Sequence, residues 1–353
     1  MYSDILARAL AKAGDDVVVW VEKHPGQPAV ERLHVGPGMA EVRRVFPHRA
    51  GRARRDVLSY AAFLLANASY LRLPRQLRQA AAGGYTKVRI LLHSSFLHHP
   101  NSLLFILRSL RHTGVADTKL ILDVRDFSLP PSQAHLLGAF DRIITSSQKV
   151  ADFLREERGA GDDILPILMP FERPDVPDRD EVELVLDRYG LAGKRFLFNP
   201  NGITYSKHFA VMREAVGLLR RDPRFADVIL VTVGRERDRT HADTDAEQRQ
   251  EAVYLGNIGQ RDVLSLMKAA MFTVILSNRE AISRAALEAM AVGGRVLLPD
   301  LAEFTRNCES HVVSTITSDV LVNKIVNLFD KPMSKFSFEQ HEADAFVPQY
   351  RSL

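Results

Sequence analysis

The sequence predicts an α/β protein made of two doubly wound domains, and three observations support this prediction. The chain has 353 residues, roughly twice a common domain length of about 150 residues. Short, nearly all-apolar runs alternate with helical patterns in both halves, as expected of parallel sheets covered by helices on both faces. A segment with three prolines and dense charge, residues 170–180, separates the halves and has the composition of a linker.

The predicted elements follow from hydrophobic periodicity. In the first half, apolar runs predict strands at 16–22, 87–93, 119–125 and 141–147, and the segments between them predict helices at 2–13, 56–82, 102–112 and 148–157. In the second half we expect strands at 195–200, 228–233, 272–276 and 295–299, and helices at 208–221, 261–270, 284–291 and 318–328. A doubly wound domain normally opens with a strand and a glycine-rich turn, whereas this chain opens with a helix. We therefore expect the first strand and its loop to be missing; the alternative is a sheet that begins one unit later.

The composition excludes several classes of protein. Hydrophobic residues make up 46% of the chain and charged residues 25%, which is ordinary for a soluble globular protein and unlike a disordered or collagenous chain. The single cysteine, Cys308, has no partner for an internal disulfide, so a cytoplasmic location is the expectation. No apolar stretch reaches the roughly 20 residues that span a bilayer, and the N-terminus lacks a signal-peptide pattern.

The charge is modest but uneven. The net charge is +4, yet the 41 residues from Arg49 to Arg89 carry nine Lys and Arg against Asp56 alone. No zinc, homeodomain-like or aromatic RNA-binding pattern accompanies this excess, so we predict no nucleic-acid partner. The arginines of Arg49–Arg78 flank a low-charge stretch, residues 57–71. This pattern is typical of a basic amphipathic helix on the anionic inner face of a membrane; the alternative is a core helix with solvated arginines.

The ends of the second-half strands bring polar groups together. Ligands of open parallel sheets bind outside the carboxyl ends of the strands. Three of these ends are followed by glycines, cations and one carboxylate: Gly202 and Lys207, then Gly234 and Arg235, then Arg279 and Glu280. We expect these residues to lie at one edge of the sheet.

The helix predicted at 284–291 starts beside this edge. Ser283 is a good N-cap residue, and the backbone amides from Ala281 through Ile282 to about Ala285 are suited to a phosphate or diphosphate. Glu288 lies in an otherwise apolar helix, where a carboxylate is costly unless a partner such as a ribose hydroxyl binds it. The alternative for Glu288 is a solvated helix residue, and for Glu280 a surface acid.

The segment 274–300 resembles the characteristic motif of retaining glycosyltransferases of the GT-B fold, family 4 (group 1). The shared pattern is Glu280, seven residues, Glu288, and then the Ala-Met-Ala-Val-Gly stretch of residues 289–293. Segments 253–270 and 201–208 are weaker matches, and the resemblance extends in order over most of residues 2–330. It implies two Rossmann-like domains facing across a cleft: residues 1–175 on the acceptor side, residues 176–335 binding the nucleotide sugar, and a tail, 336–353, that returns to the first domain.

The resemblance also implies a reaction. A sugar is transferred, with its anomeric configuration retained, from a UDP- or GDP-linked donor to a glycan or lipid-linked acceptor in surface glycan or glycolipid synthesis. No cofactor and no metal are required. Lys207 contacts the diphosphate, Glu280 and His93 lie near the transferred sugar, and Glu288 binds the ribose. Gly256 and Asn257 lie in the loop that contacts the base. The remaining residues implied at the donor site are Gly202, Gly234, Arg235, Arg279, Ala281, Ile282 and Ser283.

The sequence departs from the family at several of these positions. Ile203 stands where arginine is usual, which leaves Arg235 or Arg279 to supply the second cation. His208 replaces a glycine, and Ala281-Ile282-Ser283 replaces Gly-Phe-Gly. These differences keep two alternatives open: a GT-B-fold partner protein that has lost catalysis, and a sugar-nucleotide epimerase of similar fold. His93 has a local alternative as well, a histidine bonded to backbone at the end of a strand.

Overall fold

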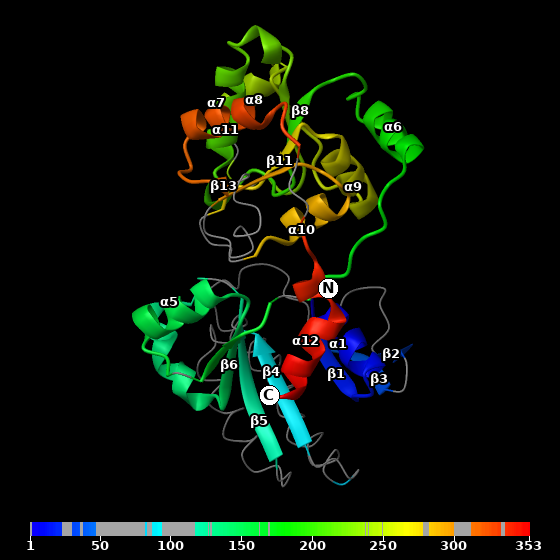
Figure 1. Ribbon diagram of the computed structural model, residues 1–353, viewed down its shortest axis with the longest axis vertical. Coiled ribbons are helices and arrows are strands. Elements are labelled where there is room, and N and C mark those ends of the chain that lie inside the picture. The colour runs from blue at the N-terminus through cyan, green and yellow to red at the C-terminus, as the bar shows by residue number, and fades with distance from the viewer. Residues whose placement is uncertain are drawn as a thin grey trace, which may run out of the picture. The chain divides into compact units, whose positions relative to one another are not determined.

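The computed structural model divides the chain into two compact units. Unit 1 comprises Met1–Pro170 and Glu339–Leu353, and unit 2 comprises Phe171–Phe338. The structure describes residues 2–22, 30–35, 38–46, 82, 87–93, 117–125, 127, 129–161, 163–168, 170–236, 238, 240–248, 250–277, 282–299, 312–332 and 336–353. Figure 1 shows the elements of each unit.

Unit 1 contains two sheets. Strands β4 (Lys87–His93), β5 (Asp117–Val124), β6 (Arg142–Thr145) and β7 (Ile164–Pro166) pair in sequence order, all parallel. Five consecutive residues of β5, Leu120 to Val124, are buried, as expected of a parallel strand covered on both faces. Helix α5 (Gln148–Arg158) follows β6 and is capped by the Ser147 hydroxyl, which accepts from the Val150 amide.

The second sheet of unit 1 corrects one expectation. The predicted strand 16–22 exists as β1 (Val17–Glu22), but it pairs in parallel with β3 (Gly38–Phe46), which in turn pairs antiparallel with β2 (Val30–Val35). In the described residues β1 is therefore not a strand of the β4–β7 sheet. The strand was predicted, but its sheet was not. Its partner strands β2 and β3 form a polar hairpin whose apolar pattern is too weak to predict from the sequence. The predicted helices 56–82 and 102–112 lie outside the described residues, apart from residue 82.

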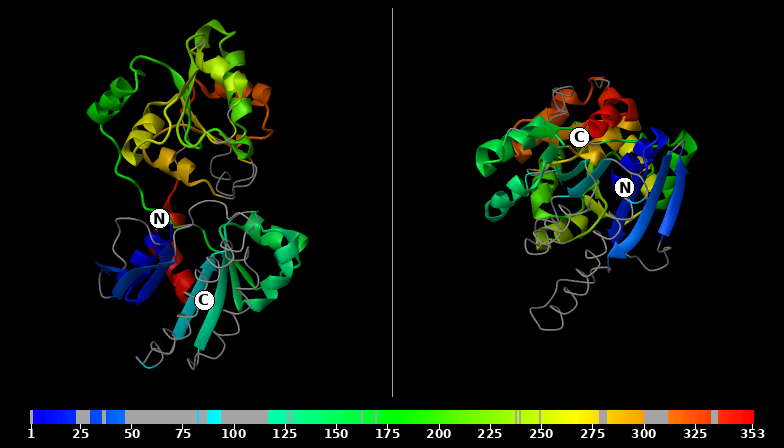
Figure 2. Two further views of the ribbon diagram at one scale, coloured as in Figure 1. Left: turned by 180° about the vertical axis from the view of Figure 1, so that it is seen from behind. Right: turned by 90° about the horizontal axis from the view of Figure 1, so that it is seen from below.

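The C-terminal helix belongs to unit 1. Helices α1 (Tyr2–Lys12) and α12 (Ala343–Arg351) lie side by side (Figure 2). Phe346 and Tyr350 of α12 join Leu6 of α1 and Ile121 of β5 in one buried cluster. A charged contact adds to this packing, because Arg351 Nε lies 2.8 Å from the Asp15 carboxylate.

Unit 2 is a doubly wound sheet of six parallel strands. They are β8 (Phe196–Asn199), β9 (Ile229–Thr232), β10 (Ala252–Tyr254), β11 (Phe272–Val274), β12 (Val296–Pro299) and β13 (Val312–Val313). Their order in the sheet is β10-β9-β8-β11-β12-β13. The chain therefore moves one way from β8 to β10 and then returns to the other side of β8 with β11.

Alternate residues of these strands pack into two cores, one on each face of the sheet. Leu197 and Leu230 contribute to the core with α7 (Phe209–Leu219) and α11 (Ser318–Leu328). Phe198 and Val231 contribute to the other core, with α6 (Arg179–Arg188), α9 (Gln260–Ala269) and α10 (Arg284–Ala291). The period of two in a strand explains this division. The remaining helix, α8 (His241–Gln248), lies between β9 and β10 in the chain.

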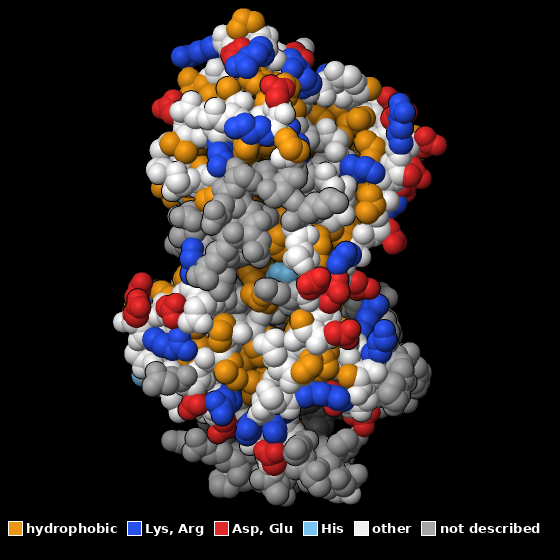
Figure 3. Space-filling model, in the orientation of Figure 1, with side chains coloured by type: hydrophobic (Ala, Val, Ile, Leu, Met, Phe, Trp, Pro, Cys, Tyr) orange, Lys and Arg blue, Asp and Glu red, His pale blue; other side chains and the backbone are white. Residues whose placement is uncertain are grey.

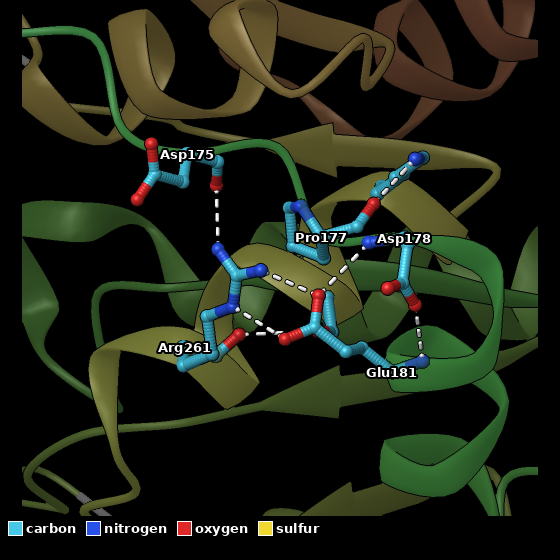
Figure 4. Close-up of polar contacts among 7 residues, drawn as sticks. Asp175, Pro177, Asp178, Glu181 and Arg261 are labelled. Carbon is cyan, nitrogen blue, oxygen red and sulfur yellow. Dashed lines mark hydrogen bonds and ion pairs between the residues drawn. The ribbon is translucent and has the colours of Figure 1, made fainter.

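The segment that leads into unit 2 is fastened to α9 (Figure 4). Arg261 of α9 donates to the Asp175 carbonyl at 2.7 Å and to the Glu181 carboxylate, and Lys268 donates to the Pro177 carbonyl at 2.6 Å. Asp178 and Glu181 also form a capping box at the start of α6. The Arg261 hydrogen bond is the main cause that lowers the pKa of Glu181 below its usual value. Acidic and basic side chains are intermixed around α6 on the surface as well (Figure 3).

No helix among the described residues is long and apolar enough to cross a membrane.

Candidate functional site

The strand order of unit 2 defines where a ligand site is expected. The chain reverses direction between β8 and β11, which are neighbours in the sheet. In open parallel sheets, ligands bind beyond the carboxyl ends of the strands at such a reversal. The loops that follow β8, β9, β10 and β11 all leave at this edge, because all of these strands are parallel.

The loops after β8 and β9 are held in close backbone contact by two glycines. Gly202 has a φ of +72°, and a Cβ on it would lie 2.4 Å from the Arg235 carbonyl oxygen. Gly234 has a φ of +105°, and a Cβ there would lie 3.2 Å from the Gly202 nitrogen. The Ile203 amide donates to the Arg235 carbonyl at 2.9 Å across this contact. Both glycines are therefore required by backbone conformation and close approach.

Two buried polar side chains, those of Asn199 and Thr232, hold the start of the same loops through hydrogen bonds. Asn199, the last residue of β8, donates through Nδ2 to the Gly202 carbonyl at 2.9 Å and to Thr232 Oγ1 at 2.8 Å. Its Oδ1 accepts from the Asn201 amide at 3.1 Å. Sequence reasoning missed Asn199 and Thr232. Their signal was a polar residue near the end of each of two apolar strands.

Lys207 reaches across the reversal point. It ends a short 3-10 helix, Tyr205–Lys207, and its Nζ lies 3.4 Å from Ser277 Oγ in the segment after β11. Ser277 is buried, with 1% of its surface exposed. Burial lowers the pKa of the Lys207 amine, because a low-dielectric environment disfavours the charged form. An anion bound at this edge would therefore interact with the Lys207 amine, a cation that water solvates poorly.

Helix α10 starts at the same edge but differs in detail from the expectation. Ser283 occupies the N-cap position and is 5% exposed, yet its hydroxyl makes no capping hydrogen bond. Glu288 is 8% exposed and forms an ion pair with Arg284 one turn earlier, with 2.9 Å between Oε1 and the guanidinium. Sequence reasoning missed Arg284, although the i, i+4 spacing signals such a pair. The ion pair offsets part of the desolvation of Glu288 without any ligand.

The other predicted residues fall into three groups. Gly256 lies at the same edge, where its carbonyl accepts from the Gly234 amide at 2.6 Å, and the exposed Asn257 follows it. Arg235 is exposed beside the Gly202 contact, and Ile282 packs against the core. Ile203 is 1% exposed in the other core, so its side chain is directed into the fold.

For four of the predicted residues, the side chain lies outside the description. Arg279, Glu280 and Ala281 lie outside the described residues. His93 ends β4 in unit 1, opposite Asp123 of β5 in the strand register, and its side chain is likewise outside the description.

In the part of the chain that the structure describes, no group of three or more His, Cys, Asp or Glu side chains could hold a metal ion. Among the described polar side chains at the edge of unit 2, Asn199 bonds Thr232 and Lys207 lies beside Ser277.

Comparison with known proteins locates the same region. Residues 188–323, within unit 2, match the family model described as glycosyl transferases group 1. No curated protein sequence matches the chain.

Solved structures match the chain over nearly its whole length. The sucrose-phosphate synthase of Thermosynechococcus elongatus is 17% identical, with a TM-score of 0.68, and the match covers 99% of this chain and 91% of that one. An α,α-trehalose 6-phosphate synthase from Burkholderia multivorans is 15% identical, with a TM-score of 0.61 and coverage of 100% and 93%.

The HepE protein of Anabaena, solved in complex with UDP and glucose, is 13% identical, with a TM-score of 0.63 and coverage of 99% and 95%. These likenesses confirm the predicted fold class: the protein has the GT-B fold, with two Rossmann-like units.

Proposed function

We propose that the protein is a retaining glycosyltransferase that uses a nucleotide-diphosphate sugar, UDP- or GDP-linked, as its donor. Unit 2 binds the donor and unit 1 provides the acceptor side. The bond between the anomeric carbon and the diphosphate oxygen breaks, the acceptor hydroxyl oxygen bonds to that carbon, and the hydroxyl proton leaves with the nucleoside diphosphate. The acceptor is a glycan or a lipid-linked sugar in the synthesis of surface glycans.

One observation carries this proposal. At the reversal point of the sheet, Lys207 from the β8 loop lies 3.4 Å from Ser277 after β11, beside the crossed backbones of Gly202 and Arg235. The family match falls on the same unit. A half-buried amine among glycine-rich loops is suited to a diphosphate, which gains negative charge as it leaves.

The residues have distinct roles in this proposal. Lys207 and Arg235 neutralise the diphosphate, with Arg279 as a further cation, and the amides of residues 281–283 at the start of α10 stabilise it through the helix dipole. This arrangement does not need a metal ion. Glu280 and His93 act at the transferred sugar, and Gly256 and Asn257 contact the base.

Glu288 binds the ribose hydroxyls in this proposal. Its ion pair with Arg284 fixes the carboxylate and leaves the second carboxylate oxygen for the ribose. An ionised carboxylate accepts through both oxygens, so the two partners are compatible.

The test begins with thermal-shift screening of UDP- and GDP-linked sugars, followed by product analysis with the stabilising donor. We expect a nucleoside diphosphate and a glycosylated acceptor of retained configuration. An altered sugar nucleotide without any acceptor would instead identify an epimerase. Donor binding without transfer or donor hydrolysis would identify a binding or partner protein.

We also propose that the basic segment Arg49–Arg78, which lies outside the described residues, docks the protein on an anionic membrane surface near a lipid-linked acceptor. Each arginine close to such a surface contributes about 1 kcal/mol. Co-sedimentation with liposomes tests this: binding should require anionic lipid and fade near 1 M salt, where the Debye length is about 3 Å. Equal failure to sediment with neutral and anionic liposomes would contradict it.

A further inference from the structure

Several unusual features gather on one loop of unit 2, residues 200–208 between β8 and α7, called here the β8–α7 loop. Three buried side-chain atoms in it lack any hydrogen-bond partner: Asn201 Nδ2, Thr204 Oγ1 and His208 Nε2. More than nine in ten buried polar groups in proteins are paired. Leaving one unpaired costs about 1–3 kcal/mol. Three in so short a segment therefore call for a physical reason.

His208 adds backbone strain to this loop. Its φ of +50° and ψ of +42° are left-handed, a conformation that costs a residue with a Cβ about 1–2 kcal/mol. Only one other non-glycine residue in the described part of the chain, Gln250, has a positive φ. His208 is the left-handed C-cap of the 3-10 helix Tyr205–Lys207, a position that favours glycine, and it also stands at the N-cap of α7 without making a side-chain capping bond.

The chemistry of the three atoms points to an oxyanion. An asparagine Nδ2 only donates hydrogen bonds, a threonine hydroxyl can donate, and a histidine Nε2 donates when it carries the proton. Burial lowers the pKa of His208, which favours the neutral imidazole, and a neutral imidazole still presents one N–H. Phosphate oxygens would accept from all three. The adjacent Lys207 supplies the matching positive charge.

The three atoms have almost no accessible surface, so a ligand reaches them only if the loop moves. The backbone supports a movement confined to the later part of this loop, residues 204–208. The earlier part is fixed by Asn199, which bonds Gly202 and Thr232, and by the buried Ile203, whose amide donates to the Arg235 carbonyl at 2.9 Å. In the later part the backbone bonds are those of local turns, and the Tyr205 amide donates to the exposed Asp238 carboxylate at 2.7 Å.

We propose that the β8–α7 loop rearranges when a diphosphate binds, and that Asn201, Thr204 and His208 then donate hydrogen bonds to the phosphate oxygens. This inference rests on the proposed function for the identity of the ligand. His208 is a binding and positioning residue here: ligand binding relieves the backbone strain at His208 and gives the three unpaired atoms their hydrogen-bond partners. A ligand that interacts better with one of two conformations shifts the population toward it.

The variant His208→Gly tests the inference, with Gln250→Gly as its matched control. Each variant removes a left-handed residue that bears a side chain, so both should raise the melting temperature of the ligand-free protein. Only His208→Gly should weaken binding. We expect its affinity for UDP or GDP, and for inorganic pyrophosphate, to fall about 10- to 100-fold, the loss typical of one hydrogen bond to a charged group.

Hydrogen exchange of the full-length protein supplies the second readout. Pyrophosphate, UDP or GDP should slow exchange in residues 200–208 of the wild type and of Gln250→Gly, and much less so in His208→Gly. Equal affinities in the three proteins, or unchanged exchange in the loop when ligand binds, would overturn the inference even if sugar transfer is observed. Protection of the loop by pyrophosphate, with no transfer from any donor, would support the inference and contradict the proposed function. Failure of all three probes to bind the wild type would overturn both.

Discussion

The carboxyl edges of the two parallel sheets differ in whether their buried polar side chains have partners within the chain. In unit 1, the buried Asp123 at the end of β5 forms an ion pair with Arg125. Arg125 also donates to the Ile167 carbonyl at 3.2 Å and to the Tyr350 hydroxyl at 2.6 Å, and its own carbonyl accepts from Ser146 at 2.8 Å. The described polar groups at the ends of β5 and β6 are therefore paired within the chain.

In unit 2, the corresponding edge contains buried atoms of Asn201, Thr204 and His208 without partners, beside a lysine whose pKa is lowered by burial. The difference indicates that the contacts around Arg125 in unit 1 serve stability and that the β8–α7 loop of unit 2 serves a ligand. Substitutions that remove the Arg125 contacts should therefore act on folding, and substitutions of the polar groups beside the β8–α7 loop on binding and turnover. The predictions below test this contrast.

The largest effect is expected for Lys207→Ala. Because the cation acts on the charge that develops on the leaving diphosphate, the variant should lose on the order of 10²-fold in transfer rate, with a smaller loss in donor affinity. Steady-state kinetics with the donor found by screening measures both. Lys194→Ala, an exposed lysine at the opposite end of β8, is the control and should keep full activity. Equal turnover by Lys207→Ala and the wild type would remove Lys207 from the site.

Glu288→Ala should weaken binding of the nucleoside diphosphate by roughly 10- to 150-fold, the equivalent of about 1.5–3 kcal/mol for a lost hydrogen bond to a charged group. Calorimetric titration measures it. Glu183 of α6 also pairs with an arginine four residues away, Arg179, but that pair is exposed, so Glu183→Ala should leave affinity unchanged. If a folded Glu288→Ala protein binds as tightly as the wild type, Glu288 serves only its pair with Arg284.

Gly202→Ala and Gly256→Ala compare a crowded glycine with an open one. Both residues are left-handed, at φ +72° and +65°, but only the Gly202 methyl would overlap backbone atoms. Each variant pays about 1–2 kcal/mol for its conformation, and Gly202→Ala should lose about 1–3 kcal/mol more through steric overlap. Denaturant unfolding measures the two free energies of unfolding. Equal losses would mean that the β8 and β9 loops separate easily.

Tyr350→Phe should lower the free energy of unfolding by about 1 kcal/mol, the net value of one hydrogen bond, and leave donor affinity unchanged. Tyr205→Phe is the control, because Tyr205 is 86% exposed and its hydroxyl should contribute little to stability. A change in donor affinity in Tyr350→Phe would contradict the assignment of the Arg125–Tyr350 contact to stability.

The smallest expected effect is a pH-dependent gain in stability. Burial lowers the folded-state pKa of Lys207 below its unfolded value, so the charged amine opposes folding at neutral pH and this penalty fades as pH rises toward the ordinary lysine pKa of about 10.4. Lys207→Met should therefore melt at a higher temperature than the wild type near pH 7, and the gain should shrink at alkaline pH. Melting curves across that range test the sign; a gain that grows with pH would contradict it.

The sequence predicted the central elements of unit 2 well, because β8, β9, β11 and β12 are nearly all-apolar runs and α10 and α11 follow with clear periodicity. It could not predict contacts that depend on which strands become neighbours. Asn199 meets Thr232 only because β8 lies beside β9, and Arg125 meets Tyr350 across 225 residues of sequence.

Sequence reasoning was also weak for polar residues whose burial can be explained either by a ligand or by a contact within the fold. The spacing of Arg284 and Glu288 is visible in the sequence, yet the ion pair between them was not predicted. The unpaired atoms of the β8–α7 loop had no sequence signal, since polar residues in a loop are normally solvated. The roles of Arg279, Glu280, Ala281 and His93 stay predictions.

The division of the chain has a consequence for its biosynthesis. Unit 1 consists of residues that come before and after unit 2 in the sequence. Its C-terminal helix, α12, supplies Phe346 and Tyr350 to the core of unit 1. On the ribosome, domains generally fold as units in the order in which they emerge, but here unit 2 can be completed before unit 1. Residues 1–170 must wait for the last helix while all of unit 2 is translated, so nascent chains halted before residue 339 should bind chaperones through the uncovered face of β5.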